Sequence, residues 1–341
     1  MTGARVIVYN PNFVNPYAYE VGSVLSRLGF SVSVWSPVSE SARSIPGVRV
    51  RRFLAAPRRG SGIFATAFRR FWGPLATALS AGRRGILVVA WVKDPWDARI
   101  MKWRARLVGR TVAVYHNPYQ VRGDRRDSTS ERALMKSAQP VVHSERLRGL
   151  VLNEFPDVRV VGHPAYSTMI DGRRWGGGPR GVFAFVGELR PDKGADLLPQ
   201  IAHRSGGGWT VRFLGSGPLP DDFRQELEAE KVTVINRVED YQPSDDELVE
   251  ALLECAALLA PYTAVTTSGS MILARSLGLP VITADDPTAV TMPSAAVVEQ
   301  VAAAIAASLS DGPARVQATG EDIDAWAMRS WHDMLEECFG E

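Results

Sequence analysis

The stretch from Ala256 to Thr283 constrains the fold of this chain most strongly, because two short apolar runs flank a helical pattern there. Residues 257–260 and 280–283 carry no charge, which is typical of strands that are covered on both faces of a parallel sheet. Between them, apolar residues recur at helical spacing over residues 268–277, and a glycine follows, as is common at a helix end. The stretch therefore predicts a strand, a helix and a second strand of an α/β protein.

The entrance to the predicted helix has the chemistry of a phosphate-binding site. Residues 266–270 read Thr-Thr-Ser-Gly-Ser, so small hydroxyl groups and a glycine gather at the helix N-terminus. Backbone N–H groups point outward there, the helix dipole favours an anion, and glycine lets a ligand approach the backbone closely. Serine and threonine are also ordinary helix caps, so this segment taken alone leaves a purely structural role open.

Bulk composition favours a two-domain protein of a reducing compartment. The 341 residues suffice for two domains of ordinary size, and 45% hydrophobic with 22% charged residues is typical of globular proteins. No run of about 18 uncharged apolar residues predicts a membrane-spanning helix, and the N-terminus lacks the apolar core of a signal peptide. The two cysteines, Cys255 and Cys338, form neither a metal-binding spacing nor a disulfide framework.

The two halves of the chain carry opposite charge, although the net charge of the whole chain is only +2. Residues 1–170 hold 26 Lys and Arg against 10 Asp and Glu, a balance of +16, and residues 171–341 hold 13 against 27, a balance of −14. This asymmetry predicts two domains with different partners, the partner of the first one being anionic. Nucleic acid, a lipid surface and a phosphorylated substrate all fit this pattern.

Apolar runs alternate with helical patterns in both halves, which predicts two doubly wound parallel sheets. A glycine-rich segment without periodicity, residues 162–181, coincides with the change of charge and predicts the linker. We therefore expect a first domain over residues 1–165, a second over residues 166–320, and a last helix within residues 321–341 that packs back on the first domain. The clearest predicted strands are 5–9, 31–35, 86–91, 111–115, 140–143, 182–186, 211–214 and 232–235.

Residues 49–84 combine arginines with aromatic residues and permit two interpretations. Four aromatic residues fall on one side of a helix that Pro74 is expected to end, namely Phe64, Phe68, Phe71 and Trp72. Such a pattern is typical of a helix that lies on an anionic membrane surface, and equally of a core-facing helix with a solvated basic face. No recognised nucleic-acid-binding motif accompanies it, so we expect no nucleic-acid partner.

His116 follows the predicted strand 111–115, at the carboxyl end where ligands bind in open α/β sheets. It is therefore a candidate site residue, although a lone histidine is more often structural. The loop after the first strand, residues 10–17, lacks the G-x-G-x-x-G pattern of dinucleotide sites. Dinucleotide binding is disfavoured for that reason.

Seven stretches carry a family resemblance when they are taken together: NPY (15–17), VYHN (114–117), VVHSE (141–145), GHP (162–164), FVGELRPDKG (185–194), FLGSGP (213–218) and PYTAVTTSGSMILARSLGLPVI (261–282). Each is weak alone, but they span nearly the whole chain in a consistent order. The chain resembles the GT-B glycosyltransferases of the family-4-like group, in the subgroup with an SGS motif, which includes bacterial exopolysaccharide and glycolipid enzymes.

The resemblance implies a GT-B fold, with two Rossmann-like, doubly wound parallel-sheet domains that face each other across a cleft. It implies an enzyme that transfers a sugar from a UDP-sugar or GDP-sugar and that uses neither a metal nor another cofactor. Arg190 and Lys193 match the basic pair of the family, which meets the charge of the diphosphate. The other positions that match the donor site are Gly187, Gly215, Thr267, Ser268, Gly269 and Ser270.

For the acceptor, the resemblance points to the first domain, where His116 matches a histidine at the wall of the family's cleft. An inverting transfer needs a general base, for which His116, Asp124 and Asp127 are candidates, whereas in a retaining transfer the leaving phosphate can serve. Contacts to the acceptor are implied for Asn15, Tyr17 and Asn117. We expect this acceptor to be a lipid-linked glycan or another glycoconjugate, and the enzyme to act in polysaccharide biosynthesis at the cytoplasmic face of the cell membrane.

The chain departs from the family at one place. Many members carry two acidic residues across the helix over residues 268–277, and the corresponding positions here are Thr266 and Leu273. Two alternatives therefore stand beside the transferase: a sugar-nucleotide epimerase of the same fold, and a degenerate, non-catalytic member that docks on a membrane.

Overall fold

The computed structural model describes residues 3–11, 16–36, 45–52, 63–92, 95–116, 128–215, 219–236, 244–264, 267–284, 291–312 and 320–340. The chain divides into two compact units. The first comprises Met1–Pro164 and Asp324–Glu341, and the second comprises Ala165–Ile323. The sequence placed the boundary between residues 165 and 166 and the return to the first unit at residue 321.

The first unit contains a sheet of seven parallel strands in the order β3-β2-β1-β4-β5-β6-β7. The order reverses between β1 and β4, which is the switch point of a doubly wound sheet. The strands are β1 (Arg5–Tyr9), β2 (Ser31–Ser36), β3 (Val48–Arg52), β4 (Ile86–Val89), β5 (Thr111–Val114), β6 (Gln139–Val142) and β7 (Arg159–Val160).

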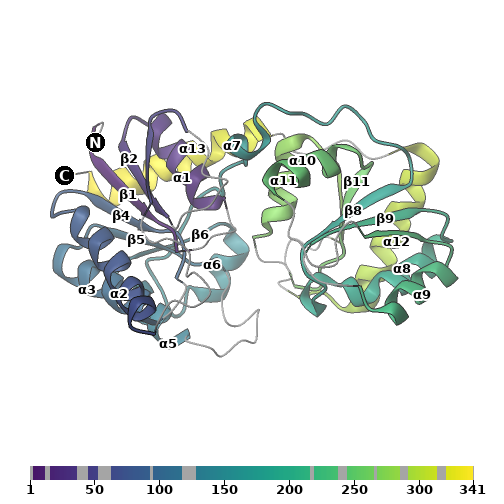
Figure 1. The fold of residues 1–341 in the computed structure, drawn as a ribbon, viewed down its shortest axis with the longest axis horizontal. Helices are drawn as coiled ribbons and strands as arrows, with labels where there is room; N and C mark the ends of the chain where they lie inside the picture. Colours follow the sequence, from purple (N-terminus) through teal and green to yellow (C-terminus); the bar gives the residue numbers. More distant parts are fainter. Residues whose placement is uncertain are drawn as a thin grey trace. The chain divides into compact units, whose positions relative to one another are not determined.

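Helices cover both faces of this sheet, because alternate side chains of each strand point to opposite faces (Figure 1). Val6 and Val8 of β1 pack with α1 (Tyr17–Arg27) and α13 (Gly320–Phe339). Ile7 and Tyr9 belong to the core on the other face, under α2 (Ile63–Ser80), α3 (Pro95–Val108), α5 (Ser128–Met135) and α6 (Glu145–Val151).

The last helix, α13, completes the core of the first unit. Trp331 is fully buried, and its Nε1 donates to the carbonyl oxygen of Gly162 at 3.1 Å. The N–H of Gly162 donates to Ser330 Oγ at 2.8 Å, and a Cβ on Gly162 would lie 2.7 Å from the Cα of Ala327. Glycine at position 162 therefore lets α13 approach the backbone closely.

The second unit contains five parallel strands in the order β10-β9-β8-β11-β12, with its switch point between β8 and β11. The strands are β8 (Val182–Val186), β9 (Thr210–Leu214), β10 (Thr233–Asn236), β11 (Ala257–Ala260) and β12 (Val281–Thr283). One face is covered by α8 (Leu198–Ser205), α9 (Asp221–Ala229) and α12 (Ser294–Asp311), and the other by α7 (Ser167–Ile170), α10 (Asp245–Leu253) and α11 (Gly269–Leu277).

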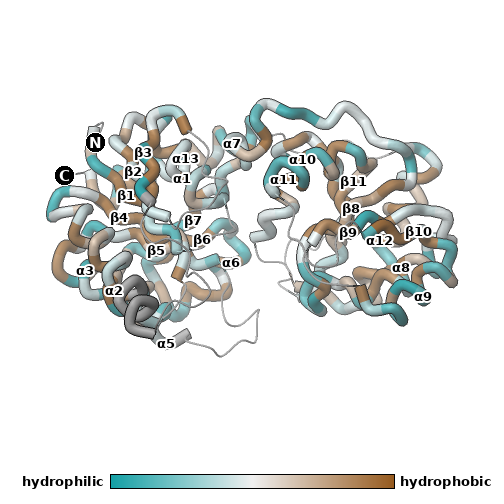
Figure 2. The backbone as a smooth tube through the Cα atoms, in the orientation of Figure 1, coloured by the Kyte–Doolittle hydropathy of each residue, from teal (hydrophilic) through white to brown (hydrophobic). Residues whose placement is uncertain are grey.

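Two parallel sheets, each with helices on both faces, confirm the predicted α/β fold of two Rossmann-like sheets. Apolar segments concentrate in the strands of both units and polar segments on the outer helices (Figure 2). Among the described residues, no helix combines the length and apolar character that crossing a bilayer requires.

The expectation that Pro74 ends its helix is wrong, because α2 continues to Ser80. Proline inside a helix removes one backbone hydrogen bond and costs about 3 kcal/mol. Thr77 and Ala78, one turn further on, are buried, and Arg104 Nε donates to the carbonyl oxygen of Ala78 at 3.2 Å. Packing of the helix on the sheet thus outweighs its local propensity. The side chains of Phe64 and Phe68 lie outside the described part of the structure.

Candidate functional site

Two loops meet at the switch point of the second unit. The loop after β8 contains Gly187 with φ of 108° and Gly194 with φ of 64°, which are left-handed conformations that favour glycine. A Cβ on Gly194 would collide with the carbonyl oxygen of Pro261, which follows β11. Thr263 Oγ1 also donates to the carbonyl oxygen of Pro191 at 3.2 Å. The loop after β8 is therefore held directly against the end of β11.

This loop, which we call the cationic loop (residues 187–194), carries Arg190 and Lys193. Arg190 Nη2 donates to Asp192 Oδ2 at 2.8 Å. Lys193 Nζ donates to the carbonyl oxygen of Val186 at 3.1 Å and lies 5.8 Å from the ring centroid of Tyr262. Residues 187–194 also contain Glu188, so the loop as a whole has no net formal charge, and its positive charge lies at Arg190 and Lys193.

The N-terminus of α11 forms the second half of the site. Ser268 is the N-cap residue, and its Oγ accepts a hydrogen bond from the N–H of Met271 at 3.4 Å. Ser270 Oγ lies 3.0 Å from Ser268 Oγ. A Cβ on Gly269 would lie 2.8 Å from Tyr166 Oη, so this turn packs tightly on Tyr166. The positive end of the helix dipole lies at these hydroxyl groups.

Tyr262 joins the cationic loop to this helix entrance. Its ring faces Lys193, and its Oη lies 2.8 Å from Ser270 Oγ and accepts from Ser268 Oγ at 3.3 Å. Only 4% of the residue is exposed, and this burial raises the pKa of Tyr262 above its ordinary value of 10, although the two serine hydrogen bonds act in the opposite direction. The phenol is therefore neutral near pH 7 and can both donate and accept.

Two polar atoms of this region are buried without a hydrogen-bond partner among the described residues, namely Arg190 Nε and Thr267 Oγ1. An unpaired buried donor costs about 1–3 kcal/mol, so native structures rarely retain one without a reason. Phosphate oxygens are suitable acceptors for both groups. Cations, a helix N-terminus and unpaired donors together have the chemistry of a site for a polyanion.

In the first unit, three histidines gather at the carboxyl ends of three neighbouring strands. His116 follows β5, His143 follows β6, and His163 follows β7. The ring of Tyr17, at the start of α1, contacts all three, with centroid distances of 4.5, 5.3 and 4.9 Å. Trp91 stacks on His116 at 4.0 Å. This set of rings is called the histidine cluster below.

Each histidine of the cluster bonds to a backbone carbonyl oxygen. The distances are 2.9 Å from His116 Nε2 to Ala90, 2.9 Å from His143 Nδ1 to Val161, and 2.7 Å from His163 Nδ1 to Pro164. A carbonyl oxygen only accepts, so these nitrogens carry the proton of the neutral ring. The opposite nitrogen, such as His116 Nδ1, then holds a lone pair.

Burial keeps the histidine cluster neutral. It lowers the pKa of His143 to about 4 and that of His163 to about 3, and it places the pKa of His116 well below 6.5, with the neighbouring His143 and His163 acting in the same direction. The cluster therefore presents hydrogen-bond acceptors and aromatic faces rather than positive charge. No group of three or more His, Cys, Asp or Glu in the described part of the chain is arranged to hold a metal ion.

Comparison with known proteins assigns a family to most of the second unit and a fold to the whole chain. Residues 180–311 match the family model for glycosyl transferases group 1. The fold is similar to that of sucrose-phosphate synthase from Thermosynechococcus elongatus, which is 14% identical, with a TM-score of 0.62 over 99% of both chains. Residues 180–311 therefore form a glycosyl transferases group 1 domain, and the chain as a whole has the GT-B fold.

Two further structures are similar to this glycosyltransferase. The catalytic domain of starch synthase IV from Arabidopsis thaliana, bound to ADP and acarbose, is 12% identical, with a TM-score of 0.61 over 100% of this chain and 99% of that one. HepE from Anabaena, in complex with UDP and glucose, is 11% identical, with a TM-score of 0.57 over 98% and 95%. At these identities the likeness shows the fold alone. No curated protein sequence matches the chain.

The glycosyltransferase brings the predicted donor-site residues to one region of its second unit. The cationic loop supplies Gly187, Arg190 and Lys193, and residues 267–270 lead into α11. Gly215 follows β9, where a Cβ would collide with the carbonyl oxygen of Gly187. In the first unit, His116 and Tyr17 are in direct contact. The remaining predicted site residues, Asn15, Asn117, Asp124 and Asp127, lie outside the described residues.

Three residues of these sites escaped the sequence reasoning. His143 and His163 each follow a strand, so the argument that selected His116 applied to them as well. Tyr262 gave a weaker signal, because it is one uncharged residue at the exit of an apolar run. Its role becomes visible only when the cationic loop and α11 are placed on either side of it.

Proposed function

We propose that the glycosyltransferase moves a sugar from a UDP-sugar or GDP-sugar to a hydroxyl group of a lipid-linked glycan or another glycoconjugate, and that it does so without a metal ion. The observation that supports the donor site most directly is the connection made by Tyr262. This side chain contacts the helix entrance through two serines and faces the cationic loop through Lys193. A diphosphate held there meets positive charge from both sides.

The reaction breaks the bond between the anomeric carbon and an oxygen of the β-phosphate, and the diphosphate leaves with the bonding electrons. Negative charge grows on that phosphate in the transition state. Arg190, Lys193 and the N-terminus of α11 are fixed donors aimed at this charge, and preorganised donors of this kind stabilise a transition state without further reorganisation. Their presence supports a mechanism in which cations and dipoles do the work of a metal ion.

We assign the acceptor to the first unit, through His116 and Tyr17 together with Asn15 and Asn117. The acceptor oxygen forms the new bond to the anomeric carbon and releases its proton. With inversion, His116 Nδ1, Asp124 or Asp127 takes this proton; with retention, the leaving diphosphate takes it. The lowered pKa of His116 makes it a weak base and a good hydrogen-bond acceptor, which favours a positioning role.

We place the reaction in the cytoplasm, at the inner face of the cell membrane, as a step of polysaccharide biosynthesis. The excess of basic residues in the first half of the chain supports an anionic surface near the acceptor. Both cysteines are free thiols, as expected in a reducing compartment.

Calorimetric titration of the full chain with UDP, GDP and uridine tests the donor site. Arg190→Ala removes a cation that donates to phosphate, so it should weaken the binding of UDP or GDP about tenfold to a hundredfold and leave that of uridine nearly unchanged. Arg204→Ala is the matched control, because Arg204 is an exposed arginine of the same unit that pairs with Glu299. This control should bind both nucleotides as the unchanged protein does.

Absence of binding of either nucleoside diphosphate at millimolar concentration would refute the proposed donor site. Equal weakening of UDP and uridine by Arg190→Ala would show that Arg190 acts on the fold rather than on the phosphates. Interconversion of a sugar nucleotide in the absence of any acceptor would establish the epimerase in place of the transferase.

A further inference from the structure

Exposed large apolar side chains concentrate on two neighbouring helices of the first unit. In the described part of the chain eight such residues are exposed, and six of them lie on α2 and α3. Single exposed apolar residues are ordinary on protein surfaces, whereas a cluster marks an interaction site. We call this cluster the aromatic face; it consists of Phe71, Trp72, Leu79, Trp96, Trp103 and Leu107, with exposed fractions from 42% to 65%.

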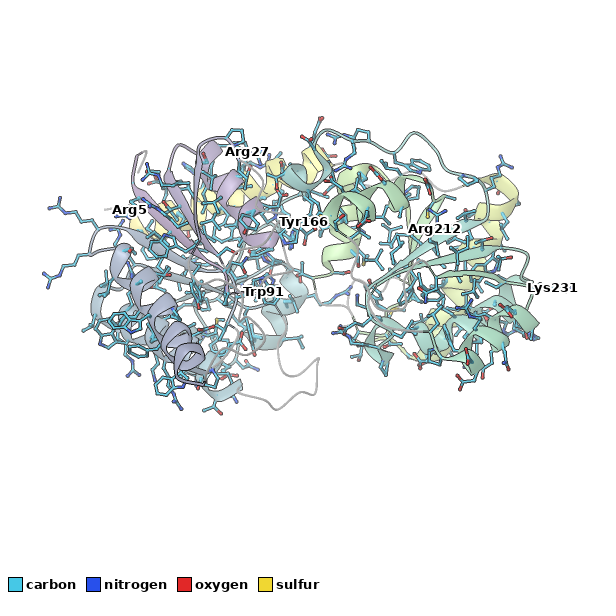
Figure 3. The ribbon with its side chains drawn as sticks, in the orientation of Figure 1. Arg5, Arg27, Trp91, Tyr166, Arg212 and Lys231 are labelled. Atoms are coloured by element: carbon cyan, nitrogen blue, oxygen red, sulfur yellow. The ribbon has the colours of Figure 1, made fainter. Side chains whose placement is uncertain are left out.

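Helical spacing places the exposed residues of each helix along one side of it, and the two helices pack against each other. On α3, Trp96, Trp103 and Leu107 are separated by seven and four residues, so they form one stripe along the helix. The opposite side of α3, with Ala98 and Met101, is buried in the core. Trp72 and Leu79 are likewise seven residues apart on α2, on the side away from the buried Thr77 and Ala78. Side chains project outward from both helices in Figure 3.

Arg104 fixes α3 against the end of α2. This arginine is 2% exposed, and its Nε and Nη2 donate to the carbonyl oxygens of Ala78 and Gly82, both at 3.2 Å. Nη2 also donates to the carbonyl oxygen of Gly85 at 2.8 Å, and Nη1 donates to Thr111 Oγ1 at 2.7 Å. Buried arginine bonded in this way makes the two helices one rigid platform.

The surroundings of the aromatic face are cationic. From residue 63 to residue 116 the sequence has ten Lys and Arg against two Asp and Glu. Asp97 is buried, whereas Arg83, Arg84, Arg99 and Arg106 are exposed. The guanidinium of Arg99 lies 5.1 Å from the ring centroid of Trp96, so cations and aromatic rings are interleaved and not segregated.

We propose that the aromatic face of α2 and α3 is a docking surface for an anionic lipid bilayer. Tryptophan prefers the boundary between headgroups and acyl chains, and exposed arginines beside it attract anionic headgroups by about 1 kcal/mol each. Nucleic acid offers no apolar medium for Leu79 and Leu107, so it fits this surface less well.

This inference rests on the proposed function, because an enzyme with a membrane-bound acceptor has to reach the membrane. The docking surface extends the expected membrane contact from residues 49–84 to α3. Neither tryptophan of α3 belongs to the donor site or the histidine cluster. Docking and nucleotide binding can therefore be lost independently of each other.

Flotation of the full chain with vesicles tests the docking surface. Vesicles of equal parts phosphatidylcholine and phosphatidylglycerol should carry the protein upward at low salt, and vesicles of phosphatidylcholine alone should carry much less. The double variant Trp96→Ser with Trp103→Ser should reduce partitioning by at least about tenfold, and Arg99→Gln with Arg106→Gln should reduce it by a similar factor. Trp326→Ser, on α13, is the matched control and should float like the unchanged protein.

The proposal is overturned if the unchanged protein does not float with anionic vesicles, or if the Trp96 and Trp103 double variant floats as well as the control. Binding of a single-stranded oligonucleotide that disappears in the double variant, without flotation of the unchanged protein, would assign the surface to nucleic acid instead. UDP titration of the same variants separates the two proposals: the double variant should bind UDP normally, and Arg190→Ala should still float.

Discussion

A single buried hydroxyl group connects the two halves of the proposed donor site in the second unit. Tyr262 Oη contacts the oxygens of Ser268 and Ser270, and the same ring lies beside Lys193. The neutral phenol sets the orientation of the two serines that precede and open α11. Its influence on a bound phosphate is therefore indirect, through groups that it holds in place.

Replacing Tyr262 with Phe removes this hydroxyl and keeps the ring. We expect the affinity for UDP to fall about twofold to tenfold, since one net hydrogen bond is worth about 0.5–1.5 kcal/mol. The affinity for uridine should stay the same, because the nucleoside lacks the phosphates. Calorimetry with both ligands measures the difference, and a variant that binds UDP with unchanged affinity would remove Tyr262 from the site.

At the scale of elements, the carboxyl ends of β5, β6 and β7 bring three neutral histidines together. Their folded-state pKa values lie below 6.5, so above pH 6.5 both the folded and the unfolded protein leave them neutral. As the pH falls below 6.5, these histidines bind protons in the unfolded chain but not in the folded chain. The free energy of unfolding then decreases until the pH reaches the folded pKa values, about 4 for His143 and about 3 for His163.

The first unit should therefore lose stability between pH 6.5 and pH 5, by up to about 1.4 kcal/mol per pH unit for each of the three histidines. Urea unfolding at several pH values measures the slope. His143→Phe should make the slope shallower by up to one proton, because it removes one of the three buried groups. A slope that does not respond to His143→Phe would contradict the assignment.

The contact between Gly162 and α13 gives a second prediction at this scale. A methyl group on Gly162 would lie 2.7 Å from the Cα of Ala327, so Gly162→Ala must displace the helix. We expect a loss of about 1–3 kcal/mol in the stability of the first unit. Gly149→Ala is the control, because a Cβ there meets no atom within 4 Å and alanine favours the helix. Thermal unfolding of both variants measures this loss of stability. Equal melting temperatures would show that α13 tolerates the methyl group.

Elements with a strong apolar pattern were predictable, and elements with mixed patterns were not. Strands such as β4 and β11 are short uncharged runs, and buried strands of parallel sheets require such runs. β3 alternates valine with arginine, as suits an edge strand. Because of its arginines, this strand was grouped with the basic segment 49–84 and was not predicted. Local rules also failed at Pro74, because the burial of α2 on the sheet is a tertiary effect that no neighbouring residue encodes.

For the whole molecule, alternating patterns and charge predicted two α/β units, and the family resemblance predicted their chemistry. The sequence alone could not show which distant residues lie in contact with each other in the fold. The roles of three residues follow from contacts with side chains that are distant along the chain. Tyr262 lies beside Lys193, and Tyr17 contacts both His143 and His163. Proximity of this kind follows from the strand order of each sheet, which local periodicity does not specify.

The path of the chain has a consequence for how the protein is made. Because Trp331 and its neighbours on α13 fill the interior of the first unit, that unit stays incomplete until α13 has left the ribosome. The second unit, which ends at Ile323, has all of its segments before the rest of α13 is made, so it can complete its fold before the first unit does. A nascent chain that stalls before residue 324 would expose the apolar side of α1 to chaperones and proteases.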